Sequence, residues 1–211
     1  MKKTLIAVSF ILLYANVITA NATLVTALPA GTIIAMAETN TFGSGPITHA
    51  PSIIWTSSNT NAVFTYTNGY GFSSNGFWGD TPAMAGTNSP VESMTWQFEN
   101  PLTAVGGLIN YSTDNGSDPT IAVYDSANNL LESAILSFSV LEPNGGQFYG
   151  FQSAFANISY FTLSGSYIGL RNLTIDTEGG QVPSAVPVPA AAWLFGSAAL
   201  GFFGLRRKNQ V

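Results

Sequence analysis

Between residues 23 and 178 hydrophobic and polar residues alternate in short runs, and no helical periodicity is sustained. Alternation of this kind predicts β-strands with one buried face. In chain order we expect strands at residues 32–37, 52–56, 62–67, 95–98, 105–111, 120–124, 130–136, 148–151, 158–163 and 169–176. Many short strands at these intervals predict an all-β domain, an antiparallel β-sandwich or jelly roll. A β-solenoid is the alternative, although the chain has no fixed-period repeat.

The segments between these runs are rich in Gly, Asn, Ser, Thr and Pro. The clearest hairpin pairs residues 120–124 with 130–136, because the intervening DSANN (125–129) has Asp and Asn, which bond their own backbone in turns. The Asn-Pro pair at 100–101 is expected to interrupt its strand. Residues 68–87 are rich in glycine and aromatic residues, and we expect them to form one long loop.

Charge is distributed unevenly along the chain. Of six lysines and arginines, two lie near the N-terminus and three near the C-terminus, which leaves Arg171 alone in the middle with all eleven acidic residues. An acidic surface without lysine repels nucleic acid, so we exclude nucleic-acid binding, whereas calcium is compatible with it. The chain has no cysteine, so an exported form has no disulfides and no thiol chemistry.

Residues 1–22 have the layout of a secretory signal peptide. Lys2 and Lys3 form its positive end, residues 5–15 its apolar core, and Ala-Asn-Ala at 20–22 fits a cleavage site. We therefore expect export through the Sec translocon, with cleavage after residue 22. Residues 23–180 then have the size of one domain with a substantial core, the expected β-sandwich ectodomain.

The pattern of the C-terminal part predicts a linker, a membrane helix and a basic end, in this order. Residues 181–189 form an uncharged, proline-rich linker that would lift the domain off the membrane. Residues 190–205 carry no charge, and as a helix they would be roughly 24 Å long, against about 30 Å of hydrocarbon. The basic tail 206–211 follows, on the cytoplasmic side by the positive-inside rule. We expect a short transmembrane helix, with a buried core helix as the alternative.

This tail resembles the PEP-CTERM sorting signal of Gram-negative, exopolysaccharide-producing bacteria, in its variant VPxPAAAWLFGS. The matching residues are Val186, Pro187, Pro189, Ala190, Ala191, Ala192, Trp193, Leu194, Phe195, Gly196 and Ser197, and Arg206, Arg207 and Lys208 form the cationic end. Val188 stands where the family has its glutamate, which leaves the specific processing enzyme open. The resemblance implies cleavage by an exosortase, a membrane-embedded enzyme that removes such tails. It further implies a precursor anchored in the inner membrane and a mature form at the cell surface or in the extracellular matrix.

Residues suited to catalysis are few. His49 is the only histidine and has no serine motif near it, so we interpret it as an ordinary loop histidine. A glycosidase needs two carboxylates, but Asp114, Asp118, Asp125 and Asp176 occur where turns and strand ends favour them. We therefore expect no enzymatic activity.

Two groups of residues are candidates for binding. Asp114, Asn115 and Asp118 offer several oxygens in one glycine-containing loop, which suits calcium, although the spacing is not that of an EF-hand. No other cofactor is expected. Flat rings and amides among residues 66–78 suit a sugar, and the candidate glycan contacts are Tyr70 and Trp78. The alternative interpretation is structural: these rings are contacts in the hydrophobic core.

We favour the core interpretation and expect a compromise between the two. In it, Phe72 and Phe77 anchor the loop inward, while Trp78 or Tyr70 is partly exposed.

The middle of the chain, from FENPLTAVGGLINY to ISYFTLSG, is similar in pattern to jelly-roll ectodomains found upstream of such tails, which look like galactose-binding and other carbohydrate-binding modules. We expect an exported surface or matrix protein with a structural or adhesive role in extracellular polysaccharide. A dedicated carbohydrate-binding module is the alternative, followed by a glycan-active enzyme.

Overall fold

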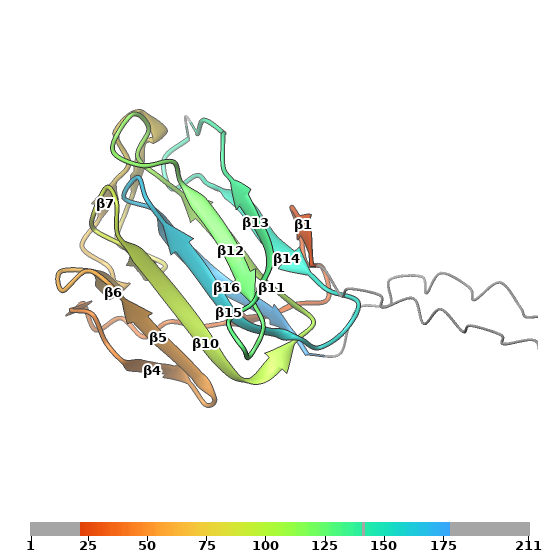
Figure 1. Ribbon diagram of the computed structural model, residues 1–211. Helices are drawn as coiled ribbons and strands as arrows, with labels where there is room; N and C mark the ends of the chain where they lie inside the picture. Colours follow the sequence, from red (N-terminus) through yellow and green to blue (C-terminus); the bar gives the residue numbers. More distant parts are fainter. Residues whose placement is uncertain (1–21, 141, 178–211) are drawn as a thin grey trace, which may run out of the picture.

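The computed structural model describes residues 22–140 and 142–177 (Figure 1). Within them the regular structure is β-strand, apart from one turn of 3-10 helix, η1 (Ser73–Asn75). Every strand pair is antiparallel. The prediction of an all-β, antiparallel domain is confirmed.

The larger sheet, called sheet A here, has eight strands in the order β1-β14-β11-β16-β9-β6-β3. The eighth, β2, pairs with the end of β16, whereas β9 pairs with its start. The bounds are β1 Thr23–Val25, β2 Thr32–Ile34, β3 Thr41–Phe42, β6 Val63–Tyr66, β9 Met84–Gly86, β11 Ala104–Asn110, β14 Gln147–Gln152 and β16 Gly169–Asp176.

The second sheet, sheet B, has six strands in the order β13-β12-β15-β10-β5-β4. Their bounds are β4 Ile47–Ala50, β5 Ile53–Ser57, β10 Ser93–Leu102, β12 Thr120–Tyr124, β13 Leu130–Ile135 and β15 Ile158–Ser164. A separate two-stranded ribbon joins β7 (Tyr70–Gly71) to β8 (Phe77–Trp78).

The last eight strands pair as one long hairpin folded over on itself. β9 pairs with β16, β10 with β15, β11 with β14 and β12 with β13. Successive pairs lie alternately in sheets A and B. The change of sheet is abrupt, since only Thr103 separates β10 from β11. The backbone N–H of Thr103 donates to the carbonyl of Asp176 at 3.0 Å, and its carbonyl accepts from Ser153 at 2.7 Å.

The core lies between the two sheets and is built around aromatic rings. Trp96 and Phe161 of sheet B are fully buried, as is Phe151 of sheet A. Phe151 meets Phe161 edge-on at a centroid distance of 6.5 Å, and Trp55 stacks on Phe64 at 4.8 Å. Removing a buried ring of this kind costs about 3–5 kcal/mol. One shared core between stacked antiparallel sheets is the arrangement of a β-sandwich and not of a solenoid.

The sequence located most strands but not all. The hairpin of β12 and β13 is confirmed, with Asp125 to Asn129 as its turn. The predicted break at residues 100–101 is wrong, because β10 continues to Leu102 and absorbs the pair in a register shift between Gln97 and Leu102. The prediction of one loop at 68–87 is also wrong, because β7, η1, β8 and β9 lie there.

Both ends of the described domain leave from one end of sheet A. Thr23 pairs with Gln152, Gln152 with Ala104, and Ala104 with Asp176. At ~4.8 Å per strand, this row places Thr23 and Asp176 roughly 14 Å apart. Figure 1 shows β1 and the end of β16 on the same side of the molecule.

The targeting elements fall outside this part of the chain. The signal peptide (1–22, apart from Ala22), the linker (181–189), the sorting motif, the expected membrane helix (190–205) and the basic tail (206–211) all lie outside the described residues. Among the residues that are described, no helix has the length and apolarity needed to cross a membrane.

Candidate functional site

Part of the outer face of sheet A is covered by other parts of the chain, whereas Ile33 of β2 and Phe42 of β3 remain exposed. A second hydrophobic cluster lies on this face, separate from the main core, and consists of Val63, Tyr70, Phe72, Trp78 and Met84, with Tyr66, Leu108 and Tyr167 packed against them. We call the segments that lie over this face the cover: residues 66–83 and the described part of 138–146. The cover is hydrogen-bonded together, because the Asn75 amide donates to the carbonyl of Phe138 at 3.3 Å and accepts from the N–H of Val140 at 3.2 Å.

Arg171 holds the cover onto β16. Its side chain is 1% exposed, and its guanidinium lies 4.7 Å from the centre of the Trp78 ring. It donates to the carbonyl of Gly79 and to Oδ1 of Asn144. These partners are neutral, so burial lowers the pKa of Arg171 to about 10. The one basic residue of the described domain therefore serves packing, and its charge does not reach the surface.

The glycan contacts predicted at Tyr70 and Trp78 are not on the surface. Trp78 is 0% exposed and donates its indole N–H to the carbonyl of Gly145 at 2.6 Å, and Tyr70 is buried beside Phe72. The expected compromise is wrong, because Phe77 is 51% exposed. Neighbouring residues of a strand point to opposite faces. In β8, Trp78 therefore points inward opposite Tyr70, and Phe77 points outward opposite Gly71.

The outer face of sheet B, in contrast, carries side chains that no segment within residues 22–140 and 142–177 covers. Buried residues alternate with half-buried or exposed ones over most of β10 and β15, and β12 has half-buried residues at both ends with three buried residues between them. The register places one outward residue from each of the six strands in a single line. We call this line the tyrosine row: Thr48, Ile54, Gln97, Tyr160, Tyr124 and Leu130.

Two tyrosines lie side by side in this row. Tyr124 and Tyr160 are directly paired across β12 and β15, and Gln97 is paired with Tyr160 on its other side. Both tyrosines are half-buried and Gln97 is exposed. Their hydroxyl and amide groups make no hydrogen bond to any residue of the described ranges. These polar atoms are therefore free to bond a ligand.

A second line runs beside the first and consists mostly of small hydroxyl side chains. It contains Thr56, Thr95, Thr162, Ser133 and the buried Ala122, and we call it the threonine row. The hydroxyls of Thr95 and Thr162 bond each other at 2.9 Å, and each retains further hydrogen-bonding capacity. Because the two rows are two residues apart along the strands, they are separated by about 7 Å.

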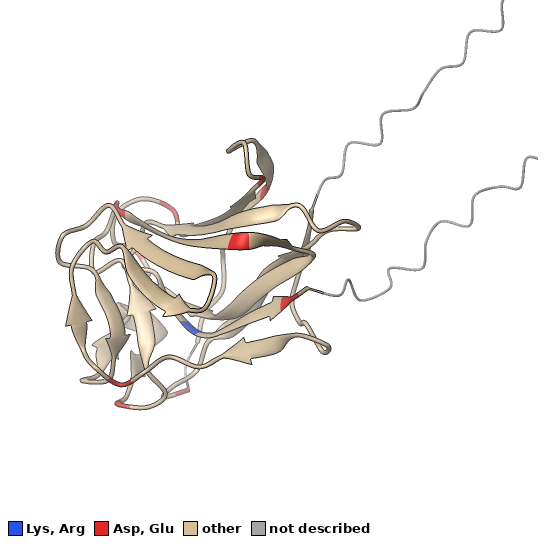
Figure 2. Ribbon diagram, turned by 90° about the horizontal axis from the view of Figure 1, so that it is seen from below, with Lys and Arg blue, Asp and Glu red and all other residues tan. Residues whose placement is uncertain are grey.

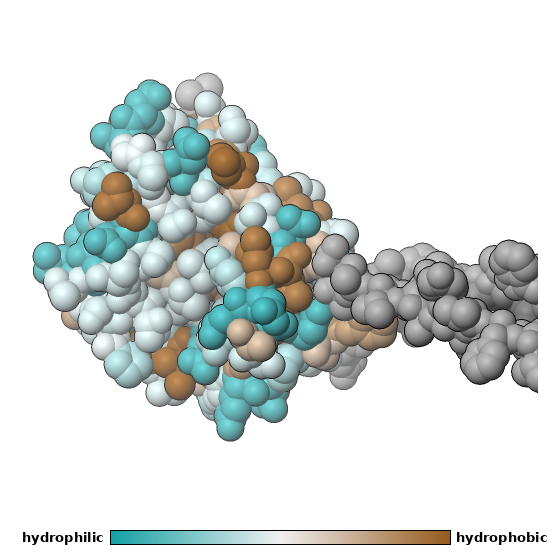
Figure 3. All heavy atoms as spheres, in the orientation of Figure 1, coloured by the Kyte–Doolittle hydropathy of each residue, from teal (hydrophilic) through white to brown (hydrophobic). Residues whose placement is uncertain are grey.

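Neither row contains a charged residue. Figure 3 shows an even, mostly pale surface over β10, β12 and β15, with hydrophobic residues at separate points around it. Figure 2 shows acidic positions scattered over loops and edges and one basic position on an inner strand. The two rows are thus uncharged, rich in hydroxyl groups and contain two adjacent aromatic rings, with the exposed carboxylate of Glu99 two residues from Gln97 along β10.

The predicted calcium loop stays a prediction. Asp114, Asn115 and Asp118 are all exposed. The Asn115 amide donates to Oγ of Ser112 at 2.8 Å and to the carbonyl of Thr113 at 2.9 Å, which shapes the loop. Within residues 22–140 and 142–177 no group of three or more His, Cys, Asp or Glu side chains is arranged to hold a metal.

His49 lies in a strand, β4, and not in the loop that the sequence suggested. The indole N–H of Trp96 donates to its Nδ1 at 3.1 Å, and its ring meets Phe64 edge-on at 5.2 Å. Burial lowers the pKa of His49. Because an indole N–H can only donate, Nδ1 is the acceptor and His49 is neutral in the fold.

The carboxylates near turns act as the sequence predicted in one clear instance. Asp125 accepts from the side chain of Asn129 at 2.9 Å and from the backbone N–H groups of Asn129 and Ala127. These hydrogen bonds, the Asn129 side chain first, lower the pKa of Asp125. The absence of an enzymatic activity remains a prediction.

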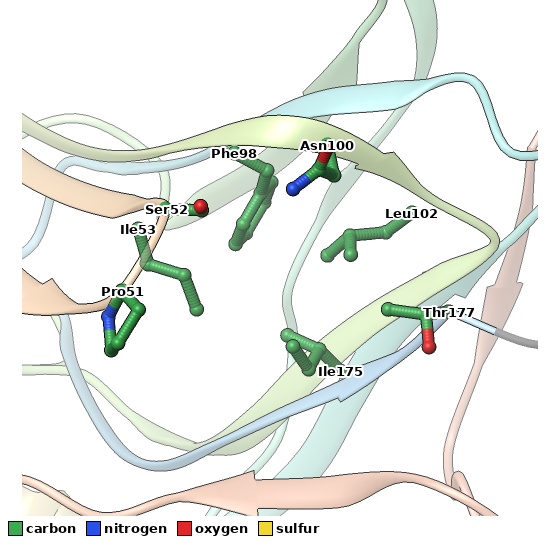
Figure 4. Close-up of a pocket in the computed structure, with 8 residues that line it drawn as sticks. All are labelled: Pro51, Ser52, Ile53, Phe98, Asn100, Leu102, Ile175 and Thr177. Atoms are coloured by element: carbon green, nitrogen blue, oxygen red, sulfur yellow. The ribbon is translucent and has the colours of Figure 1, made fainter.

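A small cavity opens at one end of the sandwich, between β5, β10 and the end of β16. Its volume is about 120 Å³, and it is lined by Pro51, Ser52, Ile53, Phe98, Asn100, Leu102, Ile175 and Thr177. Figure 4 shows Phe98, Ile53, Leu102 and Ile175 pointing toward the common space. The lining is mainly apolar and carries no ionisable side chain, so it offers no acid or base for chemistry.

No model of a protein family matches the chain, and no curated protein matches it either. The sequence did not reveal the tyrosine row, since its members come from six separate strands. The signal in the sequence is that Gln97, Tyr124 and Tyr160 each stand next to an apolar residue of the core, so they point to the opposite face of their strands. Register, which brings these positions into line, is decided by tertiary structure.

Proposed function

We propose that the protein is an exported surface or matrix protein of the PEP-CTERM type, whose β domain adheres to extracellular polysaccharide through the outer face of sheet B. The observation that carries this proposal is the pairing of Tyr124 with Tyr160 on a neutral, uncovered face. Tyrosine combines a flat apolar ring with a polar end, which suits the apolar side of a sugar ring and its hydroxyls.

The strand pairing supports a jelly roll as the finer description of the fold. In a jelly roll eight strands form two sheets through Greek-key connections. The orders β9-β16-β11-β14 and β10-β15-β12-β13 have this character, and the remaining strands extend the two sheets. A jelly roll is also the fold that the resemblance of the ectodomain implied.

The positions of the chain ends support tethering from one side. Since Thr23 and Asp176 share one row of sheet A, a signal peptide before the first and a sorting tail after the second would approach the membrane from the same end. The sandwich would then project away from that membrane. Removal of the tail by an exosortase would release or transfer the domain as a unit.

Adhesion is tested by retention on matrix polysaccharide. Mature protein from the cell surface is passed over polysaccharide extracted from the same cells, and the double variant Tyr124→Ala, Tyr160→Ala is compared with it. We expect the double variant to be lost from the retained fraction. The control is Phe155→Ala, which removes a ring that is 56% exposed and outside both rows. Equal retention of all three proteins would remove this face from the proposal.

The sorting part has its own test. Replacing Arg206, Arg207 and Lys208 with glutamine should leave unprocessed precursor in the membrane fraction, because the cations fix the orientation of the preceding segment. Intact mass of the surface form reads out the result. A surface protein that keeps residues 206–211 contradicts processing of the tail.

A further inference from the structure

We propose that the face takes a neutral, extended polysaccharide that lies across the strands, along the tyrosine row, and not an acidic polymer or a single terminal sugar. This inference rests on the proposed function, because it names the ligand class of the same site. It follows from the charge, the length and the shape of the face.

Charge excludes an anionic polymer as the preferred ligand. Recognition of carboxylate, sulfate or phosphate groups in proteins relies on Arg and Lys. The only such residue between positions 22 and 177 is Arg171, which is 1% exposed and covered by Trp78. His49 is held neutral in the fold by its burial and by Trp96. The exposed charges are acidic and would repel a polyanion.

Length favours a polymer over a single sugar. The tyrosine row crosses all six strands of sheet B, and five inter-strand steps of ~4.8 Å make it about 24 Å long. Its two ends remain open, since Thr48 on edge strand β4 is exposed and Leu130 on edge strand β13 is 56% exposed. A chain that follows the row can therefore continue beyond it in both directions.

Shape points the same way. The cavity lined by Ile53, Phe98 and Leu102 is formed by inward-facing residues of sheet B and does not open on the row. The tyrosine row lies along the face of a sheet, and such a face contacts the flat side of a chain and does not enclose a chain end. Recognition of a single terminal sugar would need such an enclosure.

The two rows divide the contacts of each bound sugar. Rings of Tyr124 and Tyr160 stack on apolar pyranose faces, and the amide of Gln97 bonds hydroxyls next to them. The threonine row, about 7 Å to one side, presents Thr95 and Thr162 to the hydroxyl-bearing edge. No contact in this arrangement involves an ion pair, so binding should be nearly independent of salt.

The experiment compares probes of different charge and length. Mature protein from the cell surface is titrated calorimetrically with cellohexaose, mannohexaose, glucose, and alginate with and without calcium. We expect at least one neutral hexasaccharide to bind at least tenfold more tightly than glucose. Its affinity should be unchanged between 50 and 500 mM salt. Tyr124→Ala or Tyr160→Ala should weaken it at least tenfold, whereas Tyr124→Phe and Tyr160→Phe keep the stacking ring and most of the affinity.

The outcomes separate this inference from the proposed function. Binding of alginate but of neither neutral hexasaccharide overturns the inference and leaves adhesion to polysaccharide standing. Equal affinity for glucose and the hexasaccharides overturns the extended mode. Failure of every probe together with failure to retain matrix polysaccharide overturns both. A circular dichroism melt of each variant guards against loss of folding as the cause, and the phenylalanine variants keep the test valid if an alanine variant unfolds.

Discussion

The two sheets of this domain share one core but differ on their outer faces. In β16 of sheet A, residues on both faces are buried, including the charged Arg171. In β10 of sheet B, buried residues alternate with accessible ones. A strand covered on both faces is buried on both sides, whereas a strand with one free face keeps the alternation of buried and accessible residues. The central strands of sheet B therefore present accessible side chains, whereas the central strand of sheet A does not.

The largest effect is expected from Trp78→Ala, which removes the centre of the cover. The lost ring leaves a cavity beside Phe72 and removes the cation–π partner of Arg171, so unfolding should be easier by about 3–5 kcal/mol. Thermal melting of the purified domain measures it. Phe77→Ala, in the next residue but 51% exposed, should change stability by less than about 1 kcal/mol. Equal losses from both variants would contradict the described cover.

A smaller effect is expected from Gly169→Ala, where the cover rests on β16. A Cβ at this position would lie 2.8 Å from Cε of Met84, 3.1 Å from the Phe72 ring and 3.2 Å from the Trp78 ring. Overpacking of this kind costs about 1–3 kcal/mol. Ser164→Ala, on the outward side of β15, is the matched change on sheet B and should stay within about 0.5 kcal/mol. Urea denaturation compares the two midpoints.

Acidification should weaken the core through His49. Because burial depresses its pKa, the unfolded chain binds the proton more readily than the fold does, and stability present at pH 7 is lost as pH falls below about 6.5 toward the folded-state pKa. Protonation of Nδ1 also breaks the bond from Trp96, and an unsatisfied buried N–H costs about 1–3 kcal/mol. Melting temperatures from pH 7.5 to 5 check this. In His49→Phe the slope in this range should be flat, even if the midpoint is lower throughout.

The smallest effect on stability is expected from Tyr124→Ala on the tyrosine row. Its ring lies on an open face, so the loss should be about 1 kcal/mol or less, while polysaccharide retention should be abolished. Denaturant midpoints and retention are measured on the same sample. A loss as large as that of Trp78→Ala would show that this ring is structural, and the contrast between the two faces would fail.

The class of the fold and the position of most strands could be predicted from the sequence, because alternation and turn chemistry depend on residues close together in the chain. The DSANN hairpin is an example, since Asp125 makes its own turn. The candidate binding site could not be predicted in this way, because it depends on residues that are far apart in the chain or on the pairing of their strands. Phe77 and Trp78 are adjacent and equally aromatic, and only the pairing of β8 with β7 decides which is exposed. Tyr124 and Tyr160 are far apart in sequence and become neighbours only through the register of β12 and β15.

The row from Thr23 to Asp176 also bears on how the domain carries mechanical load. A pull applied to the chain beyond Thr177 enters along β16, which is hydrogen-bonded to β11 on one side and to β9 and β2 on the other. Because ladder bonds of antiparallel strands lie across the strand direction, such a pull loads many of them together in shear and does not open them one at a time. A protein that is held at this end while its sheet B binds a polymer would resist tension through β16 of sheet A.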